Sequence, residues 1–77
     1  MQLNVATYPT ARAITPSDTA GNSFRAIYVG GAGNVAVVTA GGDTVTFTAP
    51  PVGSIIPVET QKVLSTGTTA TLLVGMA

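Results

Sequence analysis

From Phe24 to the end of the chain, short segments rich in β-forming residues alternate with turns rich in glycine or proline. Each segment is about six residues long, which suits a β-strand and is too short for a typical helix. The alternation is cleanest over residues 44–49, where Val45, Phe47 and Ala49 are separated by threonines. This length and period predict an all-β fold, a small antiparallel β-sandwich or barrel.

We expect about six strands, at residues 24–29, 35–39, 44–49, 54–58, 59–65 and 69–74. The first of them is apolar at odd and even positions alike, which predicts that both of its faces are covered. Pro57 has no N–H to give to a ladder, so it confines the fourth to an edge or an irregular strand. Residues 40–43 (Ala-Gly-Gly-Asp) are typical of a short hairpin connection.

The first 23 residues show neither a period of two nor one of 3.6, and Pro9 and Pro16 favour an extended chain. We therefore divide the chain into an extended N-terminal arm, residues 1–23, and a β domain, residues 24–77. The arm is expected to contact other chains, with a disordered tail as the competing interpretation. The candidate interface residues are the apolar side chains of the arm and the threonines of the alternating strand: Leu3, Val5, Tyr8, Ile14, Thr44, Thr46 and Thr48.

The chain contains few residues that could act in catalysis, because it has no histidine and no cysteine. A Ser–Lys pair could form only from Lys62 with Ser54 or Ser65, and a domain this small has little interior in which to lower a lysine pKa. The few carboxylates, of which Asp18 and Asp43 belong to turns, do not make a metal site. We predict no catalytic residue, no metal and no cofactor, so the chain is expected not to be an enzyme.

Residues 31–36 (Gly-Ala-Gly-Asn-Val-Ala) match the glycine pattern of a dinucleotide-binding loop. That loop needs a helix after it, whose N-terminus binds the pyrophosphate. Here the residues that follow, 35–39, are those of a strand, so these glycines are expected to form a hairpin turn.

Charged residues make up only 8% of the chain, against about 25% in an average soluble domain. A small domain without disulfides or metal is marginally stable alone, and a neutral, threonine-rich surface does not repel its neighbours. We therefore expect a homo-oligomer of three or five copies. Three scattered cations do not suit nucleic acid, and no apolar segment is long enough to span a membrane.

Four separated segments resemble a known family: residues 15–19, 25–34, 44–48 and 64–71, in the same order and with similar spacing. The likeness covers roughly residues 13–77, and the family is that of small head-spike base proteins of tailed phages and gene-transfer-agent particles. It implies a non-enzymatic virion protein, made in the host cytoplasm and attached to the outer capsid surface. Its implied partners are the major capsid protein and, as a further option, a spike fibre. Residues 1–12 fall outside the likeness, which leaves open a capsid decoration (cement) protein without a fibre.

The alternative from a different class is a stand-alone carbohydrate-binding or adhesion β module. Such sites usually offer exposed aromatic rings beside carboxylates and amides. Tyr28 and Phe47 lie inside predicted strands, where they are better explained as core, which leaves Tyr8 as the candidate ring. Locating the chain in a purified particle would separate the two functions.

Overall fold

The computed structural model describes residues 7–21 and 23–77, and it contains β-strands joined by turns and loops. The strands within the described residues are β1 (Ala11–Ala13), β2 (Ala26–Val29), β3 (Val35–Thr39), β4 (Thr44–Phe47), β5 (Ile55–Ile56), β6 (Thr60–Val63) and β7 (Leu73–Met76). All pairings are antiparallel, which confirms the predicted all-β fold. No helix in the described part of the chain is long and apolar enough to cross a membrane.

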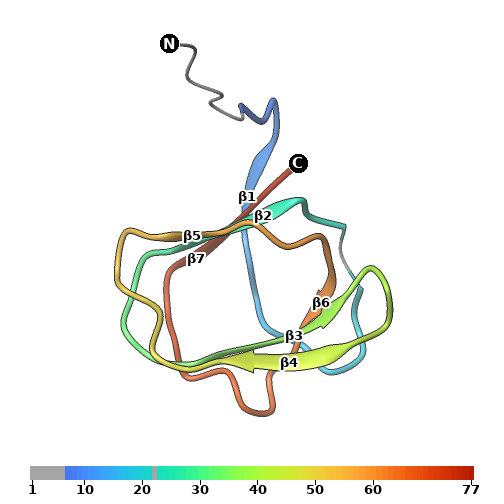
Figure 1. Ribbon diagram of the computed structural model, residues 1–77, viewed down its shortest axis with the longest axis vertical. Coiled ribbons are helices and arrows are strands. Elements are labelled where there is room, and N and C mark those ends of the chain that lie inside the picture. The colour runs from blue at the N-terminus through green and yellow to red at the C-terminus, as the bar shows by residue number, and fades with distance from the viewer. Residues whose placement is uncertain (1–6, 22) are drawn as a thin grey trace, which may run out of the picture.

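The strands form two sheets that face each other (Figure 1). The larger has the order β1-β7-β2-β5, and the smaller has the order β4-β3-β6. The chain therefore passes between the two sheets several times, and consecutive strands are paired only at β3 and β4. Most strand pairings in this fold are consequently set by tertiary contacts.

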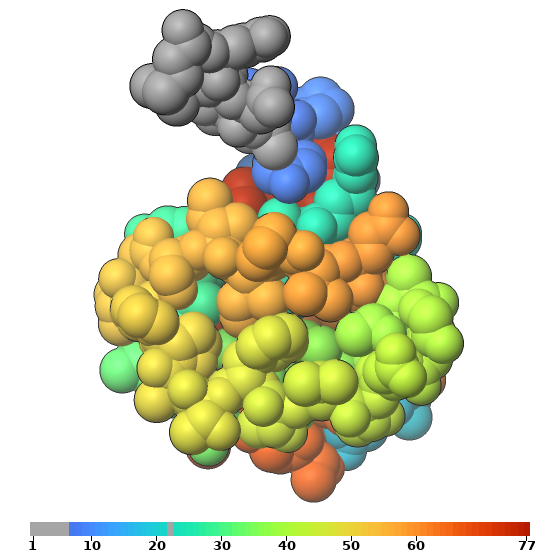
Figure 2. All heavy atoms as spheres, in the orientation of Figure 1, coloured from blue at the N-terminus to red at the C-terminus, as the bar shows by residue number. Residues whose placement is uncertain are grey.

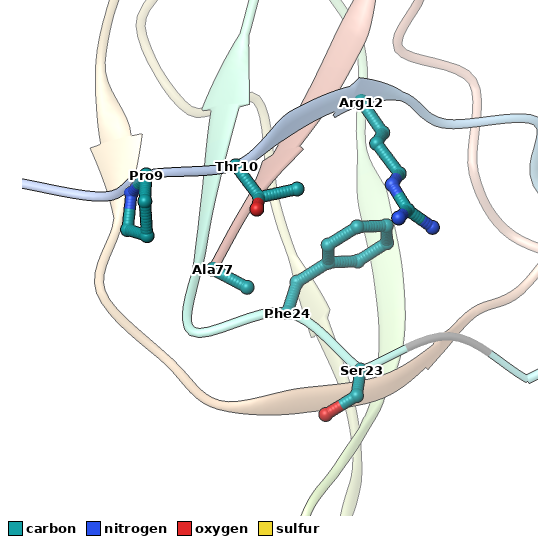
Figure 3. A pocket seen from close by; sticks show the side chains of 6 residues that line it. All are labelled: Pro9, Thr10, Arg12, Ser23, Phe24 and Ala77. Carbon is teal, nitrogen blue, oxygen red and sulfur yellow. The ribbon is translucent and has the colours of Figure 1, made fainter.

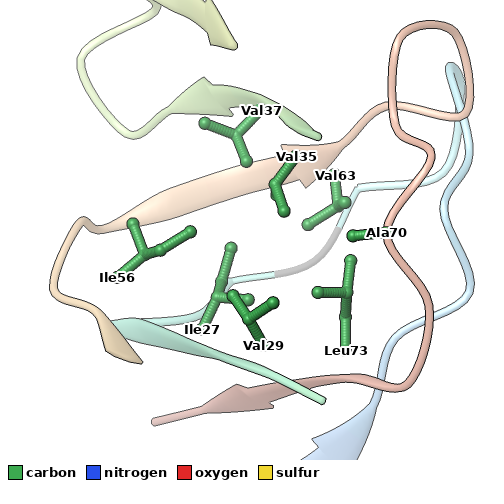
Figure 4. Packing of buried hydrophobic residues seen from close by; sticks show 8 residues of the cluster. All are labelled: Ile27, Val29, Val35, Val37, Ile56, Val63, Ala70 and Leu73. Carbon is green, nitrogen blue, oxygen red and sulfur yellow. The ribbon is translucent and has the colours of Figure 1, made fainter. Parts of the chain in front are cut away.

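The core lies between the two sheets and consists of aliphatic side chains that point inward from both (Figure 4). Its buried members are Ile27, Val29, Val35, Val37, Ile56, Val63, Ala70 and Leu73. Ile14, Phe47 and Val58 are partly buried against this cluster. β-Branched residues dominate because they suit the pleated backbone and fill a thin two-layer core.

The β3–β4 connection confirms the predicted hairpin. The Thr39 N–H donates to the Asp43 carbonyl (2.8 Å), and the Gly42 N–H donates to the Thr39 carbonyl (2.9 Å). Gly42 has a φ of 92°, a conformation that side-chain-bearing residues rarely adopt. The loop is therefore a three-residue hairpin closed by a glycine bulge.

The predicted hairpin turn at residues 30–34 is wrong, because these residues connect the two sheets. They lead from β2 in the larger sheet to β3 in the smaller one. The glycines run close to residues 69–72: a Cβ on Gly33, whose φ is 141°, would meet the backbone of Thr69 and Ala70. The glycines are thus required for close backbone approach as well as for a change of direction.

Several predicted strands differ at their ends. The sixth was expected over residues 69–74, but β7 begins at Leu73, since Leu72 has a φ of 53° that interrupts an extended chain. Residues 68–70 instead bond to the start of β3: the Asn34 N–H donates to the Thr69 hydroxyl (2.8 Å). β5 is an edge strand, as the proline predicted.

Part of the N-terminal segment contributes to the sheets. β1 pairs with β7, and the Ser17 N–H donates to the Val63 carbonyl (2.8 Å). Residues 1–6 and Asn22 lie outside the described residues. Whether residues 1–23 are separable from residues 24–77 stays a prediction, which a protein shortened to begin at Ser23 would test.

Candidate functional site

The outer face of the four-stranded sheet is apolar, whereas the solvent-facing side of an antiparallel sheet usually carries polar side chains. Paired residues on neighbouring strands share a face, so the register identifies the outward set. One row crosses all four strands and a second crosses three of them. The rows are Ala13–Val74–Tyr28–Ile55 and Ala11–Met76–Ala26, and together they are called the outer apolar face.

This face carries large apolar groups that remain open to solvent. Ile55 is 53% exposed and its pair Tyr28 is 38% exposed, while Val74 and Met76 are half-buried and Ala26 is fully buried. None of the seven residues is charged. A contiguous apolar area, in contrast to single exposed residues, is typical of a protein contact surface. Tyr28, which was predicted to lie in the core, is therefore on this surface. Its strand, β2, was expected to be covered on both faces, and the outer of these faces is available to a partner.

Among the large apolar residues that the structure describes, Leu72 is the most exposed, at 75%, and it also has the left-handed backbone conformation noted above. A non-glycine residue in that conformation costs about 1–2 kcal/mol. Its carbonyl accepts a hydrogen bond from the Gly30 N–H (3.1 Å), which fixes the residue at the start of β7. A strained residue that presents an apolar side chain to solvent is a candidate contact.

The threonines predicted as interface residues lie on an exposed edge. Thr44 and Thr46 belong to β4, one of the two edge strands of the smaller sheet, and Thr48 follows it. All three are exposed. Val45 and Phe47 face the core side of this strand, as predicted, because they pair with the inward residues Val37 and Val35 of β3.

The candidates from the N-terminal segment are in different situations. Leu3 and Val5 lie outside the described residues. Ile14 packs against the core cluster, and Tyr8 is half-buried with the Arg25 guanidinium carbon 5.8 Å from the centre of its ring. Tyr8 therefore lies within cation–π range of Arg25, and its ring is not a freely exposed platform for a sugar.

Beside Tyr8, a groove of about 480 Å³ is lined by Pro9, Thr10, Arg12, Ser23, Phe24 and Ala77 (Figure 3). Residues 10 and 77 exchange backbone hydrogen bonds, each of 2.9 Å, so this end of the molecule joins both terminal segments. The Phe24 ring forms the apolar wall, and Arg12 supplies a cation.

The carboxylates do not gather into a site. Asp18 accepts two hydrogen bonds from Thr66, from its hydroxyl (2.6 Å) and from its N–H (3.0 Å). These bonds, the hydroxyl's above all, favour the charged form and lower the pKa of Asp18 below its ordinary value. Asp18 thus ties the loop before β2 to the loop after β6, and the described residues include no group of three acids that could hold a metal ion.

Most of the outer apolar face was missed by the sequence reasoning. Its signal was present, because β2 and β7 are apolar at both odd and even positions. Such a strand is either central in a covered sheet or part of an interface, and only the sheet order distinguishes the two.

Comparison with solved structures gives a likeness over nearly the whole chain. A chain of a solved structure, the capsid of native GTA particle computed with C5 symmetry, is 38% identical to this chain. The match covers 94% of this chain and 86% of that one, with a TM-score of 0.83. No family model matches, and no curated protein matches.

Proposed function

This chain belongs to the family of the GTA capsid chain that it matches, and from that premise we propose that it attaches to the outside of a phage-type capsid. A capsid-associated structural role follows from the family itself. Beyond that role, we propose that the protein lies on the outer surface of the shell, as the base of a head spike or as a decoration protein. The observation that carries it is the likeness, at 38% identity, over nearly the whole of both chains.

The outer apolar face supplies a physical reason for attachment. Seven uncharged residues on four paired strands form a surface with two rows of apolar side chains, of which Ala26 is buried. An apolar, neutral surface gains free energy by leaving water when it docks on another protein surface. We propose that this face contacts the capsid, with the major capsid protein as the partner.

The low charge of the chain favours several copies side by side. With three cations and three acids in 77 residues, like-charge repulsion between neighbouring copies is small. We propose an assembly of three or five copies on the shell, which would also match the symmetry of positions that capsids offer. A spike fibre, where present, would bind the side of the assembly turned away from the shell.

The test is binding to capsids prepared from a host in which the gene for this chain is deleted. Purified protein is mixed with these capsids and the bound fraction is measured by co-sedimentation. The variant Ile55→Lys places a charge on the outer apolar face, at its β5 edge, and its matched control, Ala40→Lys, places the same charge in the exposed β3–β4 turn.

The wild type and Ala40→Lys should sediment with the capsids, and Ile55→Lys should lose at least about tenfold in affinity, because a buried unpaired charge costs more than 1.4 kcal/mol. Failure of the wild type to bind would contradict attachment to the shell. Equal binding by all three proteins would show that another surface makes the contact.

A further inference from the structure

The four edges of the two sheets differ in how they are protected. An unprotected edge strand exposes backbone N–H and C=O groups that can pair with another chain, so proteins usually shorten, charge or cover their edges. β5 has two residues and is followed by Pro57, and β1 has three residues with Arg12 at its centre. β6 contains Lys62 and is covered by hydrogen bonds from Ser17 and Phe24.

β4 has none of these protections among the described residues. Its four residues contain no charge and no proline, and no backbone hydrogen bond among the described residues covers its free side. Figure 2 shows the β4 segment, in yellow-green, at the surface of the molecule. β4 is therefore the edge best suited to accept a further strand.

The direction of the free backbone groups follows from the hairpin. Thr39 and Asp43 are joined by a ladder bond. From that point the backbone N–H and C=O groups of successive β4 residues point alternately toward β3 and away from it. Val45 and Phe47 direct their N–H and C=O groups toward β3, and Thr44 and Thr46 direct theirs away from it. The threonines thus present two N–H donors and two C=O acceptors to an incoming strand.

The core side of this edge is also incomplete. Val45 is paired opposite the fully buried Val37, yet it is 40% exposed. Phe47, opposite the buried Val35, is only half-buried. An added strand with apolar side chains at alternate positions would cover both residues and extend the core by one strand.

We propose that residues 1–6 of one copy add as a strand to β4 of the next copy; this rests on the proposed assembly of several copies. The segment Met-Gln-Leu-Asn-Val-Ala alternates apolar and polar residues and has no charged side chain, which matches the face and the neutrality of the edge. Leu3 and Val5 would lie beside Val45 and Phe47. Six extended residues span about 20 Å, enough to pair along the whole of β4.

The donor must come from another copy because of where the described chain begins. Thr10 is bonded to Ala77 beyond the end of β1, and this end of the molecule lies opposite β4 along the long axis (Figure 1). When each copy donates one strand and accepts one, the contact is head-to-tail, and it forms a ring when the rotation between copies closes. This is the geometry of three or five copies, whereas β4 paired with β4 would stop at a dimer.

The test uses Thr46→Pro and the deletion of residues 1–6, with Thr46→Val as the matched control. The Thr46 N–H points off the free edge, so proline there removes a donor from the intermolecular ladder and spares the bonds to β3. Valine keeps that donor and the β-branched shape. Mass is measured by light scattering on the full chain, and folding is checked by circular dichroism.

We expect the wild type and Thr46→Val to form the oligomer, and the other two proteins to be folded monomers of about 7.6 kDa. The oligomer persisting in both Thr46→Pro and the deletion, or a monomeric wild type, would overturn the proposal. Wild-type capsid binding in the co-sedimentation assay would then show that the proposed function stands without strand donation. Loss of capsid binding by Thr46→Pro with an intact oligomer would mean that the edge takes a capsid segment instead.

A cross-linking experiment identifies the donor directly, since the chain has no cysteine of its own. A Leu3→Cys protein is mixed with a Val45→Cys protein under oxidising conditions, and the covalent heterodimer is quantified. A Leu3→Cys protein mixed with Ala40→Cys is the control. The heterodimer should form several-fold faster with Val45→Cys, and equal rates would contradict the proposed pairing.

Discussion

Gly75 is a position at which a single methyl group should be damaging. Gly75 is buried in β7, and the ring of Phe24 occupies the space where a Cβ would stand. Phe24 cannot retreat easily, because its backbone exchanges two hydrogen bonds with Thr60, of 3.0 and 2.8 Å, and its side chain is only 6% exposed. Gly75→Ala therefore forces overpacking.

The expected loss of unfolding free energy is about 1–3 kcal/mol. The whole domain should have only about 4–12 kcal/mol, from 0.05–0.15 kcal/mol per residue. In urea titrations followed by circular dichroism at fixed protein concentration, the midpoint should fall by about 1–2 M at an unchanged slope. Gly41→Ala is the control, because a Cβ at Gly41 would meet nothing closer than 3.9 Å.

Phe24→Leu should partly rescue Gly75→Ala, because the smaller side chain leaves room for the methyl group. The double variant should lose at least about 1 kcal/mol less than the sum of the two single losses. A Gly75→Ala protein as stable as the wild type would refute the packing of Phe24 on β7. Strict additivity in the double variant would refute the direct contact.

Three further outcomes follow from single contacts. Phe47→Ala should cost about 2–3 kcal/mol in urea unfolding, less than a fully buried phenylalanine, with Thr46→Ala within about 0.5 kcal/mol of wild type as control. Because the folded-state pKa of Asp18 is lowered, its stabilisation is present above the unfolded pKa of about 4 and is lost as the pH falls through the folded value. The difference in melting temperature between wild type and Asp18→Asn should therefore shrink between pH 5 and pH 2, and a constant difference would contradict it. Leu72→Gly should be as stable as wild type or up to about 1 kcal/mol more stable, since it relieves a left-handed leucine that is mostly exposed, and a clear loss would show that Leu72 packs in the folded protein.

Local patterns predicted most strands of this protein. The alternation at residues 44–49 located β4 and its inward face, and Pro57 identified β5 as an edge. Both signals are local: one is the period of a pleated strand, and the other is a missing N–H. A strand can therefore be predicted from the sequence where apolar and polar residues alternate or where a proline limits its pairing.

Sheet order did not follow from the sequence, because it depends on contacts between distant residues. The glycines at 30–34 looked like a hairpin, since a glycine that permits a turn and one that permits close approach of two chains look alike in a sequence. β1 was missed because Ala-Arg-Ala has no strong β-former, and it is a strand only through its pairing with β7.

The candidate surfaces show the same division. The threonines of β4 were recognised by their alternation, but their position on an unprotected edge required the order β4-β3-β6. The outer apolar face required the register of four strands, to which residues 11, 13, 26, 28, 55, 74 and 76 contribute. Interfaces that consist of sheet faces and edges become visible only when the strands are assembled.

The position of the protein on the particle tests the central claim most directly. Density maps of capsids from the wild-type host and from a host with the gene deleted can be subtracted at the same resolution. The difference should contain several copies of a small two-sheet domain on the outer surface of the shell, with the four-stranded sheet turned toward it. Identical maps, or a difference inside the shell, would contradict attachment to the outer capsid surface.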